Sequence, residues 1–362
     1  MIHESSQLII SNRRTFLKRV STIAAGIPLV SLYHPGKASA RIFGSQKSEV
    51  SFRTGTDRRE LTYQALKPFQ KEVAKAIGDR QVIIKANAGL AEMKYAPHST
   101  NADQLRGILD FLKPIHDKQI IITEGTATVA CSAFIGFENY NYMPLEKEYN
   151  VKLVDANDQP YTLKWIRAAK HHPQAINIID MYMDPNVYLI SAARMKTHNA
   201  VVATLSLKNV AMGSPVCHYK DKKRKDKNEK SKMHGGPDSS GGRELSYNLF
   251  RVAEMGVQPD LAIIDGIETI EGNGPWAGST VEHGIVVAST DFVAADRLCV
   301  ELMGIDPKLM KYLEWCGDAG MGNFDLSNIK VDGPDYKKHI ITYKLNKNVD
   351  WQIEWIHENF GE

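Results

Sequence analysis

Residues 81–89 read QVIIKANAG, and the fold class follows from this stretch and from others like it. Each is a short, nearly continuous apolar run that becomes polar or glycine-rich at its carboxyl end. Strands that are buried on both faces of a sheet have this pattern, whereas half-exposed strands alternate apolar and polar residues. The sequence therefore predicts five buried strands, at 81–85, 119–123, 186–191, 261–265 and 284–288.

Segments with helical spacing separate several of these strands. Asp57 and Glu60 form a capping pattern that predicts a helix extending to about Ile77, and apolar residues spaced three and four apart predict helices over 101–112 and 291–303. Helices that alternate with buried strands indicate an α/β fold. We expect a mostly parallel or mixed sheet covered by helices on both faces, with two closely joined lobes as one arrangement.

Residues 1–40 have a different character. Arg13 and Arg14 precede the uncharged, mostly apolar stretch 20–32, and residues 38–40 read ASA. This order predicts a twin-arginine signal peptide, and so a periplasmic or otherwise exported protein with the twin-arginine export machinery as a partner. An ordinary amphipathic helix and an uncleaved anchor are the alternatives.

The remaining chain is predicted to divide into an N-terminal extension with the first helix (41–79), an α/β domain (80–332) and a C-terminal tail (333–362). A lysine-rich stretch at 218–236 predicts a basic surface loop within the domain. The formal charge of the whole chain is only +3, and basic residues of the signal account for it. No nucleic-acid partner is therefore expected. After the signal, no apolar run is long enough for a stable membrane span.

The chain has four cysteines, at 131, 217, 299 and 316. No two of them have a C-x-x-C spacing, so we expect no iron–sulfur cluster in this chain. An even number would permit disulfides in an oxidising compartment. Cys299 lies in an apolar helical stretch, which favours a buried free thiol there.

Polar residues follow each predicted strand, and in a parallel sheet such residues meet at one edge, where ligands bind. Lysines there would hold a small anion, and histidine or a carboxylate would transfer protons. The candidate catalytic residues are Lys196, His198, Lys208 and Asp265. The candidate ligand-binding residues are Lys85, Asn87, Glu124, Gly125, Asn209, Gly272, Asn273, Gly274 and Asp291.

Carboxylates at the same edge would suit a hard cation. Glu268 and Glu271 are the candidate ligands of a divalent metal ion. Two of the candidate site residues also have structural alternatives. Asp265 precedes a glycine, as in a common turn, and Glu124 could cap a helix. The glycines at 272–274 could likewise form a tight turn.

These motifs, taken together, resemble the family catalogued as domain of unknown function 362. The residues that carry the resemblance are 82–87, 120–125, 196–198, 204–209, 259–267, 271–275, 289–296 and 302–306. The resemblance spans roughly residues 80–332, and it implies no specific activity. Family members often accompany ferredoxin-type segments, which implies that the family works together with redox proteins. Since the cysteines here lack cluster spacing, electron transfer would need a redox partner protein.

Two functions are consistent with these features. The first is an exported enzyme that acts on a small anionic or metal-bound substrate in a redox context. The second is a non-catalytic exported binding or accessory protein for a redox complex, whose basic stretch docks on an acidic partner. A degenerate enzyme with a structural role is a third interpretation.

Overall fold

The apolar runs of the sequence form the centre of one large sheet. The computed structural model describes residues 47–127, 132–218, 228–236 and 242–357. In this part of the chain, nine strands form a sheet with the order β11-β1-β10-β9-β7-β2-β3-β4, and β8 pairs with β7. The strands are β1 (Ser48–Thr54), β2 (Gln81–Lys85), β3 (Ile120–Glu124), β4 (Val151–Asp155), β7 (Val187–Thr197), β8 (Ala203–Thr204), β9 (Leu261–Asn273), β10 (Ala277–Ser289) and β11 (Ile329–Asp332).

The sheet is mixed. Strands β4, β3, β2, β7 and β9 run parallel to one another. β10 runs antiparallel to both β9 and β1, while β11 runs parallel to β1. The prediction of a mostly parallel or mixed α/β sheet is confirmed. All five predicted strands occur, and the last two are parts of one long hairpin, β9–β10.

Helices connect the parallel strands. They are α2 (Arg58–Leu66), α3 (Gln70–Ile77), α4 (Ala102–Leu112), α5 (Ala133–Asn139), α6 (Leu145–Glu148), α7 (Ser206–Gly213), α8 (Glu229–Lys232), α9 (Arg243–Glu254), α10 (Phe292–Leu302), α11 (Lys311–Asp318) and α12 (Val349–Ile353). Asp57 caps α2 by accepting the Glu60 N–H at 3.1 Å, as its sequence position predicts. The single helix expected up to Ile77 is broken at Pro68, which cannot donate a backbone hydrogen bond.

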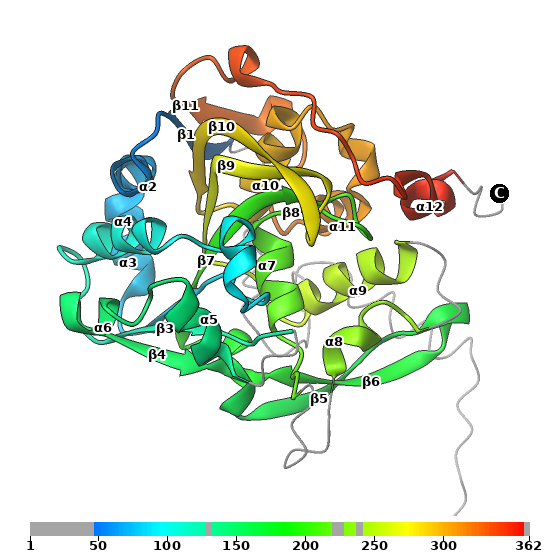
Figure 1. The fold of residues 1–362 in the computed structure, drawn as a ribbon, viewed down its shortest axis with the longest axis horizontal. Coiled ribbons are helices and arrows are strands. Elements are labelled where there is room, and N and C mark those ends of the chain that lie inside the picture. Colours follow the sequence, from blue (N-terminus) through cyan, green and yellow to red (C-terminus); the bar gives the residue numbers. More distant parts are fainter. Residues whose placement is uncertain (1–46, 128–131, 219–227, 237–241, 358–362) are drawn as a thin grey trace, which may run out of the picture. The chain divides into compact units, whose positions relative to one another are not determined.

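Both faces of the sheet are buried under helices. Along β2, Ile83 points into one apolar cluster while Val82 and Ile84 point into the other. Helices α7, α9 and α10 contribute to the first cluster, and α2, α3 and α4 to the second. Figure 1 shows α4 and α7 on opposite sides of β7. Burial on both faces explains why these strands lack alternation.

A second, two-stranded sheet consists of β5 (Tyr161–Arg167) and β6 (Pro173–Ile179). The described residues belong to one compact unit. In this unit, no helix combines the length and apolar character that crossing a membrane requires.

Two segments differ from their sequence interpretation. The N-terminal extension contains β1, which pairs with β10 and β11. Within the lysine-rich stretch, residues 228–236 do not form an exposed loop: they include α8, which buries Glu229 and Lys230 against the rest of the protein. Lys230 Nζ donates to the Gly125 carbonyl at 2.5 Å and Glu229 pairs with Lys232 at 2.6 Å, so both buried side chains have protein partners.

Some sequence predictions concern residues outside the described part. The signal peptide at 1–40, Cys131 and residues 219–227 are among them. Cys299 and Cys316 are buried free thiols, which confirms the interpretation of Cys299. Burial raises the pKa of both thiols well above the usual range.

Candidate functional site

A cavity of about 380 Å³ lies at the carboxyl ends of β2, β3 and β7. This volume is in the range of small-molecule sites. The loops after these strands, one face of α7, α8 and the tip of the β9–β10 hairpin enclose it. Its lining includes Lys85, Asn87, Gly89, Leu90, Glu124, Lys196, His198, Thr204, Lys208, Asn209, Met212, Gly213, Asn228, Lys230, His234, Pro275 and Trp276.

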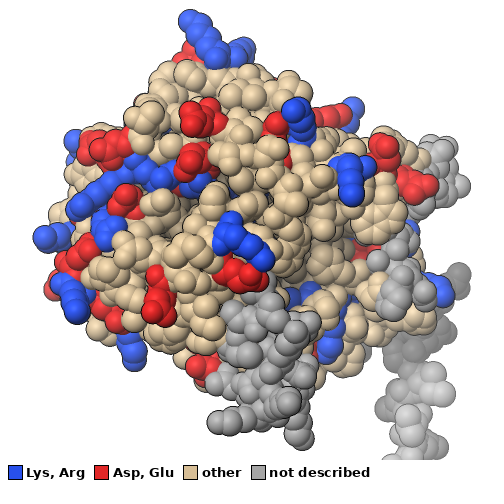
Figure 2. All heavy atoms as spheres, viewed as in Figure 1, with Lys and Arg blue, Asp and Glu red and all other residues tan. Residues whose placement is uncertain are grey.

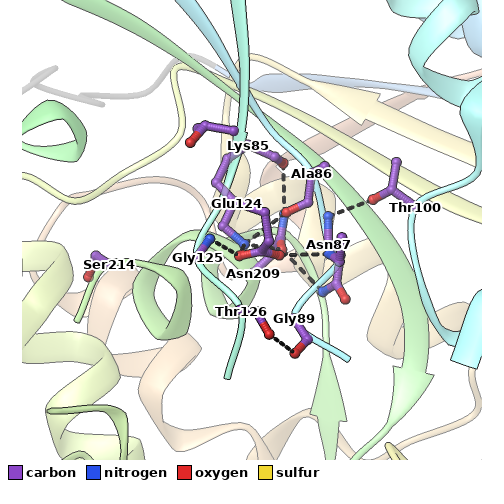
Figure 3. A network of polar contacts seen from close by, with 12 residues as sticks. Lys85, Ala86, Asn87, Gly89, Thr100, Glu124, Gly125, Thr126, Asn209 and Ser214 are labelled. Carbon is purple, nitrogen blue, oxygen red and sulfur yellow. Dashed lines mark hydrogen bonds and ion pairs between the residues drawn. The ribbon is translucent and has the colours of Figure 1, made fainter. Parts of the chain in front are cut away.

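An ion pair between the ends of two neighbouring strands forms one side of the cavity (Figure 3). Lys85 Nζ lies 2.7 Å from Glu124 Oε1, and both side chains are only 2% exposed. Glu124 also accepts the backbone N–H groups of Ala88 and Gly125, at 2.7 and 2.8 Å. Gly213 of α7 leaves the space for Lys85, because a β-carbon there would overlap Lys85 Cε. Burial lowers the pKa of Lys85 to about 8, although Glu124 opposes the shift.

Two further lysines line the cavity without a carboxylate partner. Lys196 Nζ donates to Asn87 Oδ1 at 3.0 Å and to the His98 carbonyl at 2.6 Å. Lys208 Nζ contacts no acceptor in the described residues, although its side chain is only 5% exposed. Burial, with smaller contributions from neighbouring positive charges, lowers the pKa of each lysine to about 7. A bound anion would raise both pKa values again.

His198 lies directly after β7 and has a defined tautomer. Its Nδ1 accepts the backbone N–H of Ala200 at 3.1 Å, so the proton of the neutral ring belongs on Nε2. Burial keeps the pKa of His198 well below its usual range, and the charge of Lys208 adds to this effect. The ring is therefore a neutral Nε2–H donor toward the cavity.

Lys230 of α8 completes a cluster of four lysines around the cavity, which we call the lysine cluster (Lys85, Lys196, Lys208 and Lys230). Its Nζ donates to the Gly125 carbonyl at 2.5 Å. The sequence interpretation missed Lys230 because nothing distinguishes it from the other lysines of its basic run. Asn209 joins the cluster to β2, since its Oδ1 accepts from Lys85 Nζ at 3.2 Å and from Asn87 Nδ2 at 3.1 Å.

The opposite side of the cavity is aromatic. Trp276, at the tip of the β9–β10 hairpin, is 46% exposed and packs edge-on against Tyr95, with the ring centroids 5.7 Å apart. The sequence marked Trp276 only through its position beside the glycine-rich turn. The cavity thus combines a cationic end with an apolar wall.

Comparison with known proteins supports the family resemblance that the sequence motifs indicate. The family described as domain of unknown function (DUF362) matches residues 82–301, which include most of the strands and α7. The chain belongs to the DUF362 family.

Two further similarities are more distant. This DUF362 protein is 27% identical to the thylakoid-associated protein sll1697 of Synechocystis sp. over 179 residues, 47% of this chain and 47% of that protein. The matched stretch thus spans about half of the relative's length. Among solved structures, the lactate racemase apoprotein from Thermoanaerobacterium thermosaccharolyticum covers 72% of this chain and 58% of its own, with 10% identity and a TM-score of 0.42.

The DUF362 fold brings only part of the predicted site together. The predicted residues that line the cavity are Lys85, Asn87, Glu124, Lys196, His198, Lys208 and Asn209. Gly125 does not line the cavity, but its carbonyl accepts a hydrogen bond from the lining residue Lys230. They converge because β2, β3 and β7 are parallel neighbours, as the sequence predicted.

Asp265 and Glu268 lie elsewhere, in a buried ion cluster with two arginines. Asp265 accepts from Arg58 Nε at 2.8 Å and from Arg194 Nη1 at 2.5 Å, and its own side chain is fully buried. Glu268 lies 3.3 Å from Arg58 Nη2 and 3.6 Å from Arg194 Nη2. The expectation that Asp265 shares the edge with Lys196 does not match this geometry.

The remaining predicted residues support the scaffold. Gly272 and Gly274 form the hairpin tip against β7, where Thr197 Oγ1 donates to the Gly272 carbonyl at 3.0 Å. Asn273 accepts the Lys347 N–H at 3.2 Å. Asp291 caps α10 and accepts from Ser48 Oγ at 2.5 Å. It lies far from the predicted edge because β10 is antiparallel to β9, which reverses the direction of its carboxyl end.

The described residues contain no group of three or more His, Cys, Asp or Glu side chains that could hold a metal ion. Glu268 and Glu271 lie three residues apart on β9, and such residues face opposite sides of a strand. Arginines bind Glu268, and Glu271 accepts the Lys344 N–H at 2.9 Å. The pair is thus not arranged as a metal site.

Acidic and basic side chains are interspersed on the face of the molecule in Figure 2. Among the described residues, lysines outnumber carboxylates at the cavity, where the lysine cluster faces Glu124.

Proposed function

We propose that this DUF362 protein is an enzyme that binds a small organic anion in the lysine cavity and transfers protons to or from it. The observation that carries the proposal is Lys208: its side chain is only 5% exposed, it lines the cavity, and its amino group contacts no acceptor in any described segment of the protein. A buried charge without a partner costs free energy, and an anionic ligand would remove this cost. The four lysines face a single carboxylate, Glu124, and Lys85 already binds it.

The cavity also holds groups suited to proton transfer. A general acid or base works best when its pKa lies near the working pH. Burial lowers the pKa of Lys196 to about 7. His198 presents a neutral Nε2–H that could stabilise negative charge developing on a substrate oxygen. Both residues sit at the end of the buried strand β7, which fixes their positions.

Titration calorimetry with acetate, pyruvate, malonate and phosphate tests anion binding. We expect binding that consumes a proton at pH 8, because a bound anion raises the pKa of Lys196 and Lys208. Buffers of different ionisation enthalpy measure this uptake. The variant Lys208→Gln should bind the anions more weakly, whereas Lys147→Gln, on an exposed helix surface, should bind as the wild type does.

Exchange of substrate hydrogen with solvent tests catalysis separately. Pyruvate incubated with the protein in D₂O should acquire deuterium at its methyl group, as followed by NMR, and Lys196→Gln should slow this exchange. Anion binding without exchange of any probe would favour the non-catalytic binding protein instead. Failure of every anion to bind would contradict both.

We further propose that the protein acts after export by the twin-arginine route. The basis is the order of the twin arginines, the apolar stretch and the small residues within residues 1–40. Replacing Arg13 and Arg14 together by lysine should leave the precursor in the cytoplasm. Cell fractionation and sequencing of the mature N-terminus, expected at Arg41, test this; an unchanged distribution would contradict it.

A further inference from the structure

The four lysines of the cluster are held differently. Lys85 pairs with Glu124, Lys196 donates two hydrogen bonds, and Lys230 binds the Gly125 carbonyl. Lys208 lines the same cavity from α7, and across the described ranges no acceptor fixes its amino group. Three of the lysines are therefore held in place by protein groups, and Lys208 is the one whose amino group is left free in the cavity.

We infer that Lys208 is a nucleophile that forms an imine with the carbonyl carbon of a small 2-oxo acid, whose carboxylate the neighbouring lysines hold. This inference rests on the proposed function and names its substrate class. A 2-oxo acid fits because its carbonyl adjoins its carboxylate, so a ligand held by Lys85 and Lys196 presents an electrophile beside them.

The surroundings of Lys208 favour the reactive form of its amine. Only a neutral amine attacks a carbonyl carbon, and burial beside other cations produces one near neutral pH. Burial, with smaller contributions from Lys196 and Lys85, lowers the pKa of Lys208 to about 7. Helix α7 fixes its backbone, because Asp296 accepts the N–H groups of Ser206 and Leu207 at the start of the helix, at 2.8 and 3.0 Å.

The reaction is a condensation that releases water. The Lys208 nitrogen lone pair forms the C–N bond, and the carbonyl π electrons move to oxygen, beside the Nε2–H of His198. The alkoxide takes a proton from the Lys196 ammonium, and the Lys196 amine then takes the proton that nitrogen loses. The carbinolamine hydroxyl takes a proton from the Lys196 ammonium and leaves as water, while the nitrogen lone pair forms the second C–N bond and gives a protonated imine. The ketone oxygen thus departs as water, and no oxidant or reductant is consumed.

Borohydride trapping tests the inference on the full-length protein. The probe is pyruvate, added with sodium borohydride, which reduces an imine to a stable amine. Mass spectrometry of the intact protein and of its peptides should find one reduced pyruvyl group, on Lys208. The variant Lys208→Arg keeps the positive charge but cannot form an imine, so it should retain pyruvate binding and lose the adduct. Lys147→Arg should lose neither.

The outcomes of this experiment separate the imine inference from the proposed function on which it rests. An adduct on Lys208 that disappears in Lys208→Arg supports the inference. Pyruvate binding without an adduct, or with an adduct confined to another lysine, overturns it and leaves the proposed function in place. Absence of pyruvate and acetate binding in the wild type overturns the proposed function itself. Peptide mapping of the wild type decides the question even if Lys208→Arg is poorly folded.

Discussion

Two groups of charged residues share the central strand β7, which contributes Arg194 to one and Lys196 to the other, and they differ in charge balance. The arginine cluster (Arg58, Arg194, Asp265 and Glu268) contains two cations and two carboxylates that pair with each other. The lysine cluster contains four cations and faces one carboxylate. In the arginine cluster, the cations and carboxylates of the protein compensate one another. The unbalanced group lines a cavity with room for an anionic ligand, which is why we propose a function there.

We expect the largest change in unfolding free energy from a substitution in the arginine cluster. Asp265→Asn would leave two guanidinium groups without their buried partner, and breaking such a pair costs about 3–5 kcal/mol of unfolding free energy. Urea denaturation followed by circular dichroism measures it. Asp110→Asn is the matched control, since Asp110 pairs with Arg59 at the surface and should cost less than about 1 kcal/mol. Equal losses of unfolding free energy in the two variants would refute the structural role of Asp265.

A substitution in the lysine cluster should change the unfolding free energy in the opposite direction. Lys208→Met removes a buried cation without a protein partner, so the free protein should gain stability, by about 1–3 kcal/mol. Lys85→Met is the control, because it strands the Glu124 carboxylate and should lose stability. The same urea denaturation measures both. A loss in Lys208→Met as large as that in Lys85→Met would mean that Lys208 is a structural residue.

Stability should also depend on pH in a defined window. Lys196 and Lys208 have folded pKa values of about 7, against 10.5 for ordinary lysine. Above pH 7 the unfolded chain therefore binds more protons than the folded one, and stability rises with pH, by on the order of 1 kcal/mol per pH unit. Buried thiols begin to oppose this rise near pH 8.5.

Urea denaturation of the ligand-free protein between about pH 7 and pH 8.5 checks this expectation. The slope should be smaller in Lys208→Met, which removes one of the lysines whose pKa is lowered. A flat or falling stability curve in the wild type would show that the buried lysines are already compensated, and the contrast between the two clusters would fail.

The smallest effect is expected at the exposed edge of the arginine cluster. The Glu268 side chain is 47% exposed, and its contacts with the two arginines are 3.3 and 3.6 Å long. Solvent screens such pairs, so Glu268→Gln should change the unfolding free energy by less than about 1 kcal/mol. A loss comparable to that in Asp265→Asn would mean that the four charges act as one unit.

The sequence predicted the parallel part of the site well and the antiparallel part poorly. Lys85, Glu124 and Lys196 follow apolar runs, and such runs form neighbouring parallel strands whose ends meet. Asp265 and Asp291 follow similar runs, but Asp265 turns toward two arginines and β10 reverses the position of Asp291. Lys230 and Trp276 lie far from any apolar run that could have marked them.

The sequence by itself determined the α/β class, the buried strands, the helix cap at Asp57, and the family. These follow from local periodicity and short motifs, which adjacent residues carry. Only the tertiary structure decided which charges are paired. Arg58 and Asp265, or Lys85 and Glu124, are distant in the chain, and no local pattern shows that Lys208 lacks a partner. Charge balance inside a protein depends on long-range contacts, and it is this balance that separates the candidate site from its scaffold.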